Sequence, residues 1–292
     1  MTVQGRIVAV TGAASGIGAA LAELAAARGA AGVAVIDVDA SGARAVADRI
    51  AEGGVKSAAF VCDLADVDAV EGLADEVVHT LGVPGLVCAN AGVTTEPAAL
   101  LESDVGDLRW ALSVNVVGTW ATLRAFSRAM TTSSESGWFM VTASEHAIGI
   151  PFAGNGAYTV SKHALLGLAD VVRRELPPHL GISVLIPGLV ATGLWRSGSL
   201  RSADYGGPRV ESEQARALLA HGMDPDIVAA RALDGVEAKR FMVATHQHAK
   251  RYFQDRAADV DEAFDALERA VGSEESLDVM DLAARLGSAT SD

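Results

Sequence analysis

A tyrosine and a lysine four residues apart, Tyr158 and Lys162 in the stretch YTVSK, are well suited to acid–base chemistry. A free tyrosine has a pKa near 10 and is mostly protonated at neutral pH. Residues four apart on a helix share one face, so the lysine charge would favour the phenolate and bring the tyrosine pKa toward the working range. The pair alone decides nothing, because Tyr and Lys at this spacing also occur on ordinary solvated helices.

A glycine-rich stretch, TGAASGIG at residues 11–18, follows an apolar run and precedes a helix-forming one. Its glycines let the backbone turn tightly and approach a pyrophosphate, whose charge the amino end of a helix favours. The spacing is GxxxGxG rather than the GxGxxG dinucleotide fingerprint, and alone it fits a structural turn equally well. The candidate cofactor-binding residues of this stretch are Gly12, Ser15, Gly16, Ile17 and Gly18.

An acidic residue, Asp37, ends the second predicted strand nineteen residues after Gly18. An acid at about this distance hydrogen-bonds the adenosine ribose 2′-hydroxyl in dinucleotide-binding folds. No Lys or Arg stands at positions 12–16 or 38. A 2′-phosphate would therefore face a carboxylate without a cation, at a cost on the order of a few kcal/mol. We predict NAD rather than NADP as the cofactor, although Asp37 could instead cap the helix that follows.

The elements that must position these residues are short apolar runs alternating with Ala/Leu-rich helical stretches. Alternation at this spacing specifies βαβ units and a parallel sheet, whose strands are buried on both faces and so read as continuous apolar runs. The predicted strands are 6–11, 32–37, 57–62, 85–90, 137–144, 181–188 and 240–245, and the predicted helices include 17–28 and 66–81. The fold class is therefore α/β, a doubly wound parallel sheet with helices on both faces.

We predict a single catalytic domain over residues 1–246, because α/β domains commonly reach this size as one unit. Residues 189–223 are rich in Gly, Ser and Arg, and a loop this long favours a mobile flap near a ligand over a plain surface loop. Residues 247–292 are expected to form a helical extension. One face of it, expected to dock on the body or on a partner subunit, carries Val260, Ala263, Phe264, Leu267 and Val271 at helical spacing.

Composition and charge exclude several functional classes. The formal net charge is −14, and an acidic average surface repels nucleic acid and anionic membranes, so we expect neither as a partner. No apolar run reaches the eighteen or so residues that span a bilayer, and no basic segment precedes an apolar one at the start, so we expect a cytoplasmic protein. The two cysteines, Cys62 and Cys88, are expected to be buried, inert thiols rather than a disulfide or a zinc site.

Eight motifs, taken in order, resemble those of the classical short-chain dehydrogenases/reductases. They are TGAASGIG, Asp37, CDL at 62–64, NAG at 90–92, Asn115, Ser144, YTVSK at 158–162 and PGLVAT at 187–192. Each motif alone is weak, but eight in this order on the expected elements are specific. The resemblance covers about residues 5–245 and implies a one-domain Rossmann-type fold, usually of seven strands, that binds a dinucleotide along the carboxyl edge of the sheet.

The resemblance also implies further cofactor contacts, carried over residue by residue. Asp63 and Leu64 would lie at the adenine, Asn90, Ala91 and Gly92 would line the adenosine ribose side, Thr192 would bind the nicotinamide carboxamide beside Pro187 and Val190, and Tyr158 and Lys162 would complete the set.

The catalytic set that the resemblance implies is Asn115, Ser144, Tyr158 and Lys162. Tyr158 would act as general acid and base, with its pKa lowered by Lys162 and by oxidised nicotinamide. Ser144 would hold the substrate oxygen and stabilise charge that develops there. Asn115, midway along a predicted helix, would support a water linking Lys162 to solvent, although a helix kink or a buried cap also explains an asparagine there.

The spacing of the serine departs from the family pattern. Ser144 stands fourteen residues before Tyr158, whereas the family serine most often stands thirteen before, and strict counting would select Glu145. A carboxylate beside the phenolate would raise the tyrosine pKa and, unless protonated, could donate nothing to a substrate oxygen. We therefore assign Ser144 and expect the loop GIPFAGNG, residues 149–156, to absorb the extra residue.

The predicted function is an NAD-dependent alcohol dehydrogenase or ketoreductase acting on a fairly hydrophobic small molecule, cyclic or aromatic. Leu194, Trp195 and Leu200 in the flap favour an apolar substrate, although a flap also needs apolar residues to close. The alternatives are an idle NAD-binding scaffold or redox sensor, and a dehydratase or epimerase on the same fold. The family also implies a homodimer or homotetramer built on helices near 104–130 and 156–176.

Each of three histidines allows two interpretations. His246 and His248 could pair on a metal, but no further ligands accompany them in a recognisable pattern, so we expect no metal. His146, two residues after Ser144, either edges the substrate pocket or is a plain loop histidine.

Overall fold

The structure is a computed structural model that describes residues 1–292 except 134, 272–278 and 289–292. The chain divides into two compact units, Met1–Tyr252 and Phe253–Asp292. The first unit, called the body below, contains every candidate cofactor-binding and catalytic residue. Its strands are β1 (Ile7–Thr11), β2 (Gly32–Asp37), β3 (Lys56–Val61), β4 (Leu86–Ala89), β5 (Gly137–Thr142), β6 (Leu180–Ile186) and β7 (Met242–Ala244).

Helices connect these strands. The α-helices of the body are α1 (Gly16–Ala27), α2 (Ala40–Glu52), α3 (Val67–Thr80), α4 (Val105–Ala111), α5 (Thr119–Thr132), α6 (Gly156–Glu175), α7 (Glu213–Leu219) and α8 (Pro225–Glu237). A π-helical segment, η2 (Leu112–Gly118), joins α4 to α5. Short 3-10 helices are η1 (Leu100–Glu102), η3 (Glu145–Ala147), η4 (Gly193–Leu200), η5 (Ala203–Tyr205) and η6 (Gln247–Ala249).

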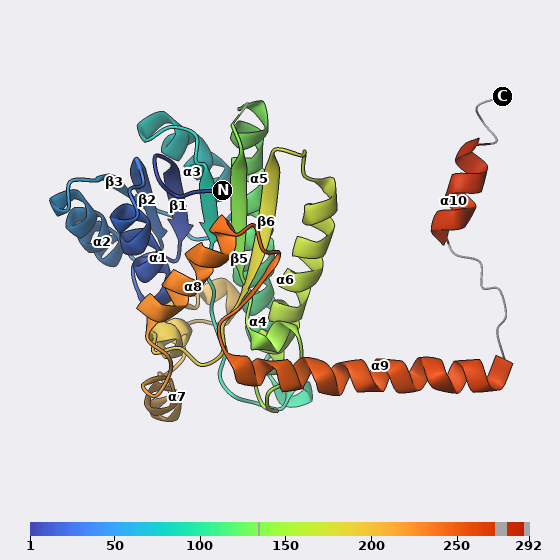
Figure 1. Ribbon diagram of the computed structural model, residues 1–292. Coiled ribbons are helices and arrows are strands. Elements are labelled where there is room, and N and C mark those ends of the chain that lie inside the picture. Colours follow the sequence, from blue (N-terminus) through green and yellow to red (C-terminus); the bar gives the residue numbers. More distant parts are fainter. Residues whose placement is uncertain (134, 272–278, 289–292) are drawn as a thin grey trace. The chain divides into compact units, whose positions relative to one another are not determined.

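The seven strands form one parallel sheet in the order β3-β2-β1-β4-β5-β6-β7 (Figure 1). The predicted α/β, doubly wound fold is confirmed. Because all strands are parallel, their carboxyl ends meet at one edge. The chain leaves β1 toward β2 and β3 and then returns to β4 on the other side of β1. This reversal places a topological switch point between β1 and β4, and such sheets bind ligands at the carboxyl edge of that point.

Each face of the sheet is covered by a separate hydrophobic core. One core lies against α3, α5 and α6 and includes Val77, Phe126 and Leu165. The other lies against α1, α2 and α8 and includes Leu21 and Leu233. Strands buried on both faces account for the unbroken apolar runs in the sequence.

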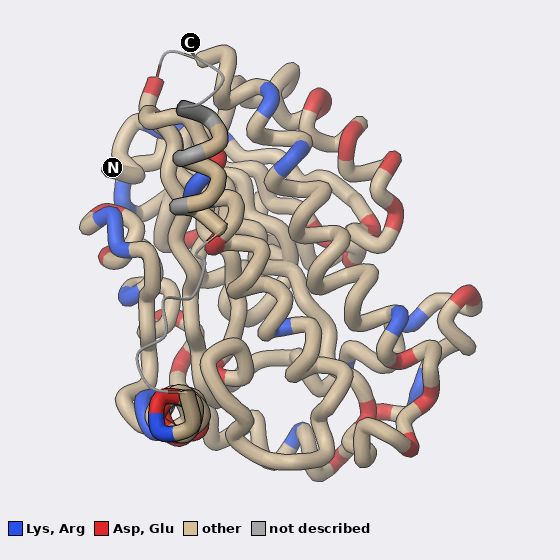
Figure 2. The backbone as a smooth tube through the Cα atoms, turned by 90° about the vertical axis from the view of Figure 1, so that its right-hand side faces the viewer, with Lys and Arg blue, Asp and Glu red and all other residues tan. Residues whose placement is uncertain are grey.

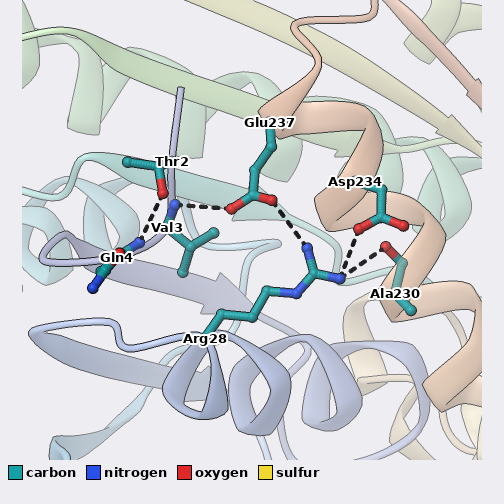
Figure 3. Close-up of polar contacts among 7 residues, drawn as sticks. All are labelled: Thr2, Val3, Gln4, Arg28, Ala230, Asp234 and Glu237. Atoms are coloured by element: carbon teal, nitrogen blue, oxygen red, sulfur yellow. Dashed lines mark hydrogen bonds and ion pairs between the residues drawn. The ribbon is translucent and has the colours of Figure 1, made fainter.

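An ion-pair cluster ties α1 to α8 (Figure 3). The Arg28 guanidinium lies 2.7 Å from a carboxylate oxygen of Asp234 and 3.2 Å from one of Glu237. The other Glu237 oxygen accepts a hydrogen bond of 3.3 Å from the backbone N–H of Val3. Helix α1 carries the glycine-rich loop at its amino end and α8 leads into β7, so the cluster joins the first and last parts of the body.

The second unit is helical in its described residues. Helix α9 (Lys250–Val271) begins in the body and continues into this unit, which also contains α10 (Val279–Ser288). Four of the predicted apolar positions of the tail, Val260, Phe264, Leu267 and Val271, have exposed side chains. What this face docks on stays a prediction.

Acidic and basic residues are interspersed along the helices of the body, and Figure 2 shows no single-sign face in its view. Among the residues that the structure describes, no helix combines the length and the apolar character needed to cross a membrane.

Candidate active site

The glycines of the loop after β1 stand where a side chain would meet close neighbours. Gly12 and Gly16 have φ of 65° and 55°, which favours glycine. A Cβ on Gly12 would lie 2.7 Å from the Cα of Ala91, and one on Gly18 would lie 2.0 Å from the Gly12 carbonyl oxygen. Ser15 precedes the first turn of α1 without capping it through its side chain. This is the geometry of a backbone cradle for an anion at a helix amino terminus.

Asp37 contacts this cradle. Its carboxylate accepts hydrogen bonds from the backbone N–H of Ala14, at 2.9 Å, and of Asp39, at 3.0 Å. The N-cap of α2 is Asp39, whose carboxylate accepts from the backbone N–H groups of Ser41 and Gly42. The sequence left open that Asp37 caps the helix after it. In the structure Asp39 caps that helix, and the Asp37 carboxylate lies beside the glycine-rich loop.

The loop after β4 is braced against two neighbouring strands. The Asn90 side chain donates to the backbone oxygen of Thr11, at 3.1 Å, and accepts from the Thr142 hydroxyl, at 3.0 Å. The Thr11 hydroxyl accepts from the backbone N–H of both Asn90 and Ala91. Asn90 therefore holds the carboxyl ends of β1, β4 and β5 together.

The residues after β3 lie at the far side of the same edge. Asp63 accepts a hydrogen bond of 2.9 Å from the backbone N–H of Ala65. Leu64 is buried, and its carbonyl oxygen lies 2.6 Å from where a Cβ on Gly118 would stand. Cys62, just before them, is a buried free thiol, as is Cys88. Burial raises the pKa of Cys62 to about 11 and that of Cys88 to about 12, so neither is a ready nucleophile.

The loop after β6 also packs against the glycine cradle. A Cβ on Gly16 would lie 3.0 Å from Cγ2 of Thr192. Thr192 is the N-cap of η4, and its hydroxyl accepts from the backbone N–H of Leu194 at 3.4 Å. The Pro187 carbonyl accepts from the backbone N–H of Glu145 at 2.8 Å, and Val190 pairs with Met223 in an isolated bridge.

Tyr158 and Lys162 lie one turn apart on α6, with the lysine Nζ 5.4 Å from the centre of the tyrosine ring. Lys162 is buried, and its ammonium donates to the Thr142 carbonyl at 2.9 Å. Burial lowers the pKa of Lys162 to about 7. Burial also raises the pKa of Tyr158 to about 12, against a hydrogen bond with Ser144 that lowers it. In the free chain burial therefore outweighs the Ser144 hydrogen bond and holds the phenol protonated. The lowering of this pKa by Lys162 together with oxidised nicotinamide stays a prediction.

Ser144 and Glu145 point to different partners. The Ser144 side chain hydrogen-bonds Tyr158 and also accepts from the backbone N–H of His146 at 3.2 Å. The nearly buried Glu145 carboxylate lies 2.8 Å from Nε2 of His248. The structure thus brings Ser144, not Glu145, to the tyrosine, although Glu145 is close enough for its charge to raise the tyrosine pKa.

Asn115 lies in the π-helical segment η2, and such segments are frequent at functional sites. Its amide oxygen accepts from the backbone N–H of Val93 at 2.7 Å, and its amide nitrogen donates to the Val93 carbonyl at 2.9 Å and to the Ser161 hydroxyl at 2.8 Å. Asn115 and Lys162 both lie 3.3 Å from where a Cβ on Gly92 would stand. Asn115 thus joins the loop after β4 to α6.

His146 lies at the tyrosine rather than in a remote loop. Its ring is 5.3 Å from that of Tyr158 and 5.1 Å from that of Phe152. Its Nδ1 is 2.8 Å from the Thr159 hydroxyl, whose own proton goes to the Asn155 carbonyl. Burial lowers the pKa of His146 to about 4, so the ring is neutral near pH 7.

Two groups of contacts gave no signal in the sequence. Arg201, at the middle of the flap, is 1% exposed and lies 3.1 Å from the Asp107 carboxylate and 3.6 Å from that of Asp104. The flap is therefore anchored to α4 at this point. His246 and His248 contact the loops after β6 and β5, and no group of three or more potential metal ligands occurs in the described part of the chain.

Comparisons with known proteins agree with this geometry. A family model described as short chain dehydrogenase matches residues 6–201. The chain belongs to the short-chain dehydrogenase family. The family and its oxidoreductase character, predicted from the motifs, are thereby confirmed.

Three proteins of known name are similar to this chain. The 1-deoxy-11-beta-hydroxypentalenate dehydrogenase of Streptomyces exfoliatus is 34% identical over 77% of this chain and 82% of that protein. The 2,5-dichloro-2,5-cyclohexadiene-1,4-diol dehydrogenase of Sphingobium indicum is 32% identical over 65% of this chain and 74% of that protein. A short chain dehydrogenase/reductase from Burkholderia phymatum, solved in complex with NAD, has a TM-score of 0.84 and 26% identity, covering 90% of this chain and 96% of that one.

Proposed function

We propose that this short-chain dehydrogenase interconverts a secondary alcohol and a ketone with NAD as the hydride carrier. The observation that carries the proposal is the convergence of Ser144, Tyr158 and Lys162 at the carboxyl edge of the sheet, beside the glycine cradle. The hydroxyl, the phenol and the buried ammonium are the groups that proton transfer to and from a substrate oxygen requires.

The residues present fit a nicotinamide dinucleotide. The cradle at Gly12, Gly16 and Gly18 excludes side chains as a pyrophosphate site must, and Thr192 lies against it. Asp37 has its carboxylate at the same loop, where it would meet a ribose hydroxyl and repel a 2′-phosphate. When bound, the cofactor supplies the hydride acceptor or donor.

In this proposal Tyr158 moves the proton and Ser144 holds the substrate oxygen. For ketone reduction the phenol donates its proton to that oxygen, and for alcohol oxidation the phenolate accepts the hydroxyl proton. The Ser144 hydrogen bond favours the phenolate, whereas burial favours the phenol. The raised pKa of about 12 in the free chain keeps Tyr158 in the form that ketone reduction uses. Lys162 is held by the Thr142 carbonyl, and its protonated form places a positive charge next to the ring.

A hydrophobic cyclic substrate is supported by two observations. The first relatives named above are dehydrogenases of hydroxypentalenate and of a cyclohexadiene diol. The second is the composition of η4, which lies within the flap (residues 189–223) and carries the apolar side chains of Leu194, Trp195 and Leu200.

The test is NADH absorbance during a panel of cyclic secondary alcohols and ketones, with NADP in parallel. We expect turnover with NAD and a loss of at least about 10² in Tyr158→Phe, the scale of losing a general base. NAD binding without turnover of any substrate would instead favour an idle scaffold or redox sensor. Substrate conversion without a net absorbance change would favour a dehydratase or epimerase. Near-normal activity of Tyr158→Phe would exclude this tyrosine as the base.

A further inference from the structure

Two histidines after β7 reach the two loops that carry candidate site residues. The first, His246, contacts the loop after β6. Its Nδ1 accepts from the backbone N–H of Gly188 at 3.0 Å, and its Nε2 lies 3.0 Å from the Leu189 carbonyl oxygen. Gly188 N–H can only donate and Leu189 oxygen can only accept, so the ring must be neutral with its proton on Nε2. Burial lowers the pKa of His246, in agreement with that state.

The second histidine, His248, contacts the loop after β5. Its Nε2 lies 2.8 Å from the Glu145 carboxylate, and Glu145 directly follows Ser144. The backbone N–H of Glu145 also donates to the Pro187 carbonyl at 2.8 Å, which links this loop to the one that His246 holds. Removing His248 would take this imidazole contact away from a nearly buried carboxylate, and a buried acceptor that loses a partner is costly.

Two glycines show how closely the three segments pack. A Cβ on Gly188 would lie 2.9 Å from Cγ of His246 and 3.0 Å from Oε2 of Glu145. A Cβ on Gly149 would lie 2.5 Å from both Cβ and the carbonyl oxygen of Tyr252. Both loops therefore meet the segment 245–252 at positions where only glycine fits without a shift.

We propose that His246 and His248 are positioning residues of the active site. His246 holds the loop 187–192, which carries Pro187, Val190 and Thr192 toward the cofactor, and His248 holds Ser144 through Glu145. The proposal rests on the function proposed above, and neither histidine contacts reacting atoms in it. Their separate partners predict separate effects: loss of His246 weakens cofactor binding, and loss of His248 slows turnover.

The test for His246 uses the full chain without substrate. In His246→Ala we expect faster hydrogen–deuterium exchange in peptides covering 186–192 and about a tenfold higher Kd for NAD by calorimetry, equivalent to about 1.4 kcal/mol. His246→Asn, which keeps an acceptor near the Nδ1 position, should recover part of both losses. His79→Ala, at an exposed histidine in the last turn of α3, is the matched control and should change neither readout.

The test for His248 separates binding from turnover. In His248→Ala we expect kcat to fall about tenfold or more, since small misplacements of a catalytic group are costly, while the Kd for NAD stays within about twofold of wild type. His248→Gln, which can still donate to Glu145, should restore most of kcat.

Several outcomes would overturn the proposal. Unchanged exchange and unchanged NAD affinity in a folded His246→Ala would do so, and so would equal losses of affinity and turnover in His248→Ala. If His246→Ala does not fold by circular dichroism, His246→Leu, which keeps side-chain volume but cannot hydrogen-bond, takes its place with the same expectations. A wild-type chain that binds no NAD contradicts the proposed function instead, and the exchange measurement still decides whether His246 holds the loop.

Discussion

At the scale of single residues, the placement of Ser144 and Glu145 bears on how the tyrosine titrates. The Ser144 hydrogen bond lowers the pKa of Tyr158, and the Glu145 charge raises it. The sequence could indicate Ser144 from its chemistry, but the direction in which Glu145 points depends on His248, about a hundred residues later in the chain. A contact of this kind has no local signal.

Ser144→Ala should lower turnover by roughly 10² and move the rising limb of the alcohol-oxidation pH profile to higher pH. The first effect is the scale of losing one oxyanion donor. The second follows from the proposal that the phenolate is the base, because removing the Ser144 hydrogen bond that lowers the pKa of Tyr158 raises that pKa. Glu145→Gln should move the same rising limb to lower pH, because it removes the charge that raises the pKa of Tyr158. Steady-state kcat/KM against pH measures both, and equal shifts in one direction would contradict the assignment.

Asp37→Ala should weaken NAD binding and relax discrimination against NADP. The substitution removes both a ribose hydrogen-bond acceptor and the charge that repels a 2′-phosphate. Kd values for both cofactors measure the change, and Asp39→Asn, at the helix cap two residues on, is a control that should leave the ratio near wild type. A wild-type protein that already uses NADP as efficiently as NAD would refute this account of Asp37.

At the scale of elements, the sheet was predictable because parallel strands buried on both faces leave continuous apolar runs. The predicted strand 137–144 ends in the structure at Thr142, since Ser144 already caps η3. The π-helical segment η2 left no local signal, and the pairing of its Asn115 with Val93 joins residues 22 positions apart in the chain. The composition of residues 189–223 indicated the flap, but it did not indicate that Arg201 anchors it. In the sequence, a buried arginine in a polar loop looks the same as an exposed one.

Arg201→Met should lower the free energy of unfolding by about 3–5 kcal/mol, since it leaves the buried Asp107 without a counter-charge. Urea denaturation measures the loss. The double variant Arg201→Met/Asp107→Leu should recover most of it, because both charges are then gone. Arg209→Met is the matched control: it breaks a more exposed pair with Asp104 and should cost less than about 1 kcal/mol. Equal losses in Arg201→Met and Arg209→Met would show that Arg201 does not anchor the flap.

At the scale of the whole molecule, the division into two units predicts that the body folds without the tail. A chain ending at Tyr252 keeps the seven-stranded sheet and both cores, and none of the α9 side chains is buried. We expect its Tm and its Kd for NAD to stay near those of the full chain. Differential scanning calorimetry and NAD titration measure this, and an unfolded or cofactor-free product would contradict it. Light scattering on both chains would show whether the apolar face of the tail joins copies.

The position of the segment 245–252 in the chain also bears on synthesis. Domains emerge from the ribosome amino end first, at about 5–20 residues per second, so Tyr158 and Lys162 are delivered several seconds before His246 and His248. A nascent chain could form the glycine cradle and the catalytic helix while Gly188 and Glu145 still lack their last partners. Premature termination just before β7 would yield a fragment with every motif of the family but without His246 and His248. If these histidines position the active site as proposed, release of the last residues of the body is the step that completes it.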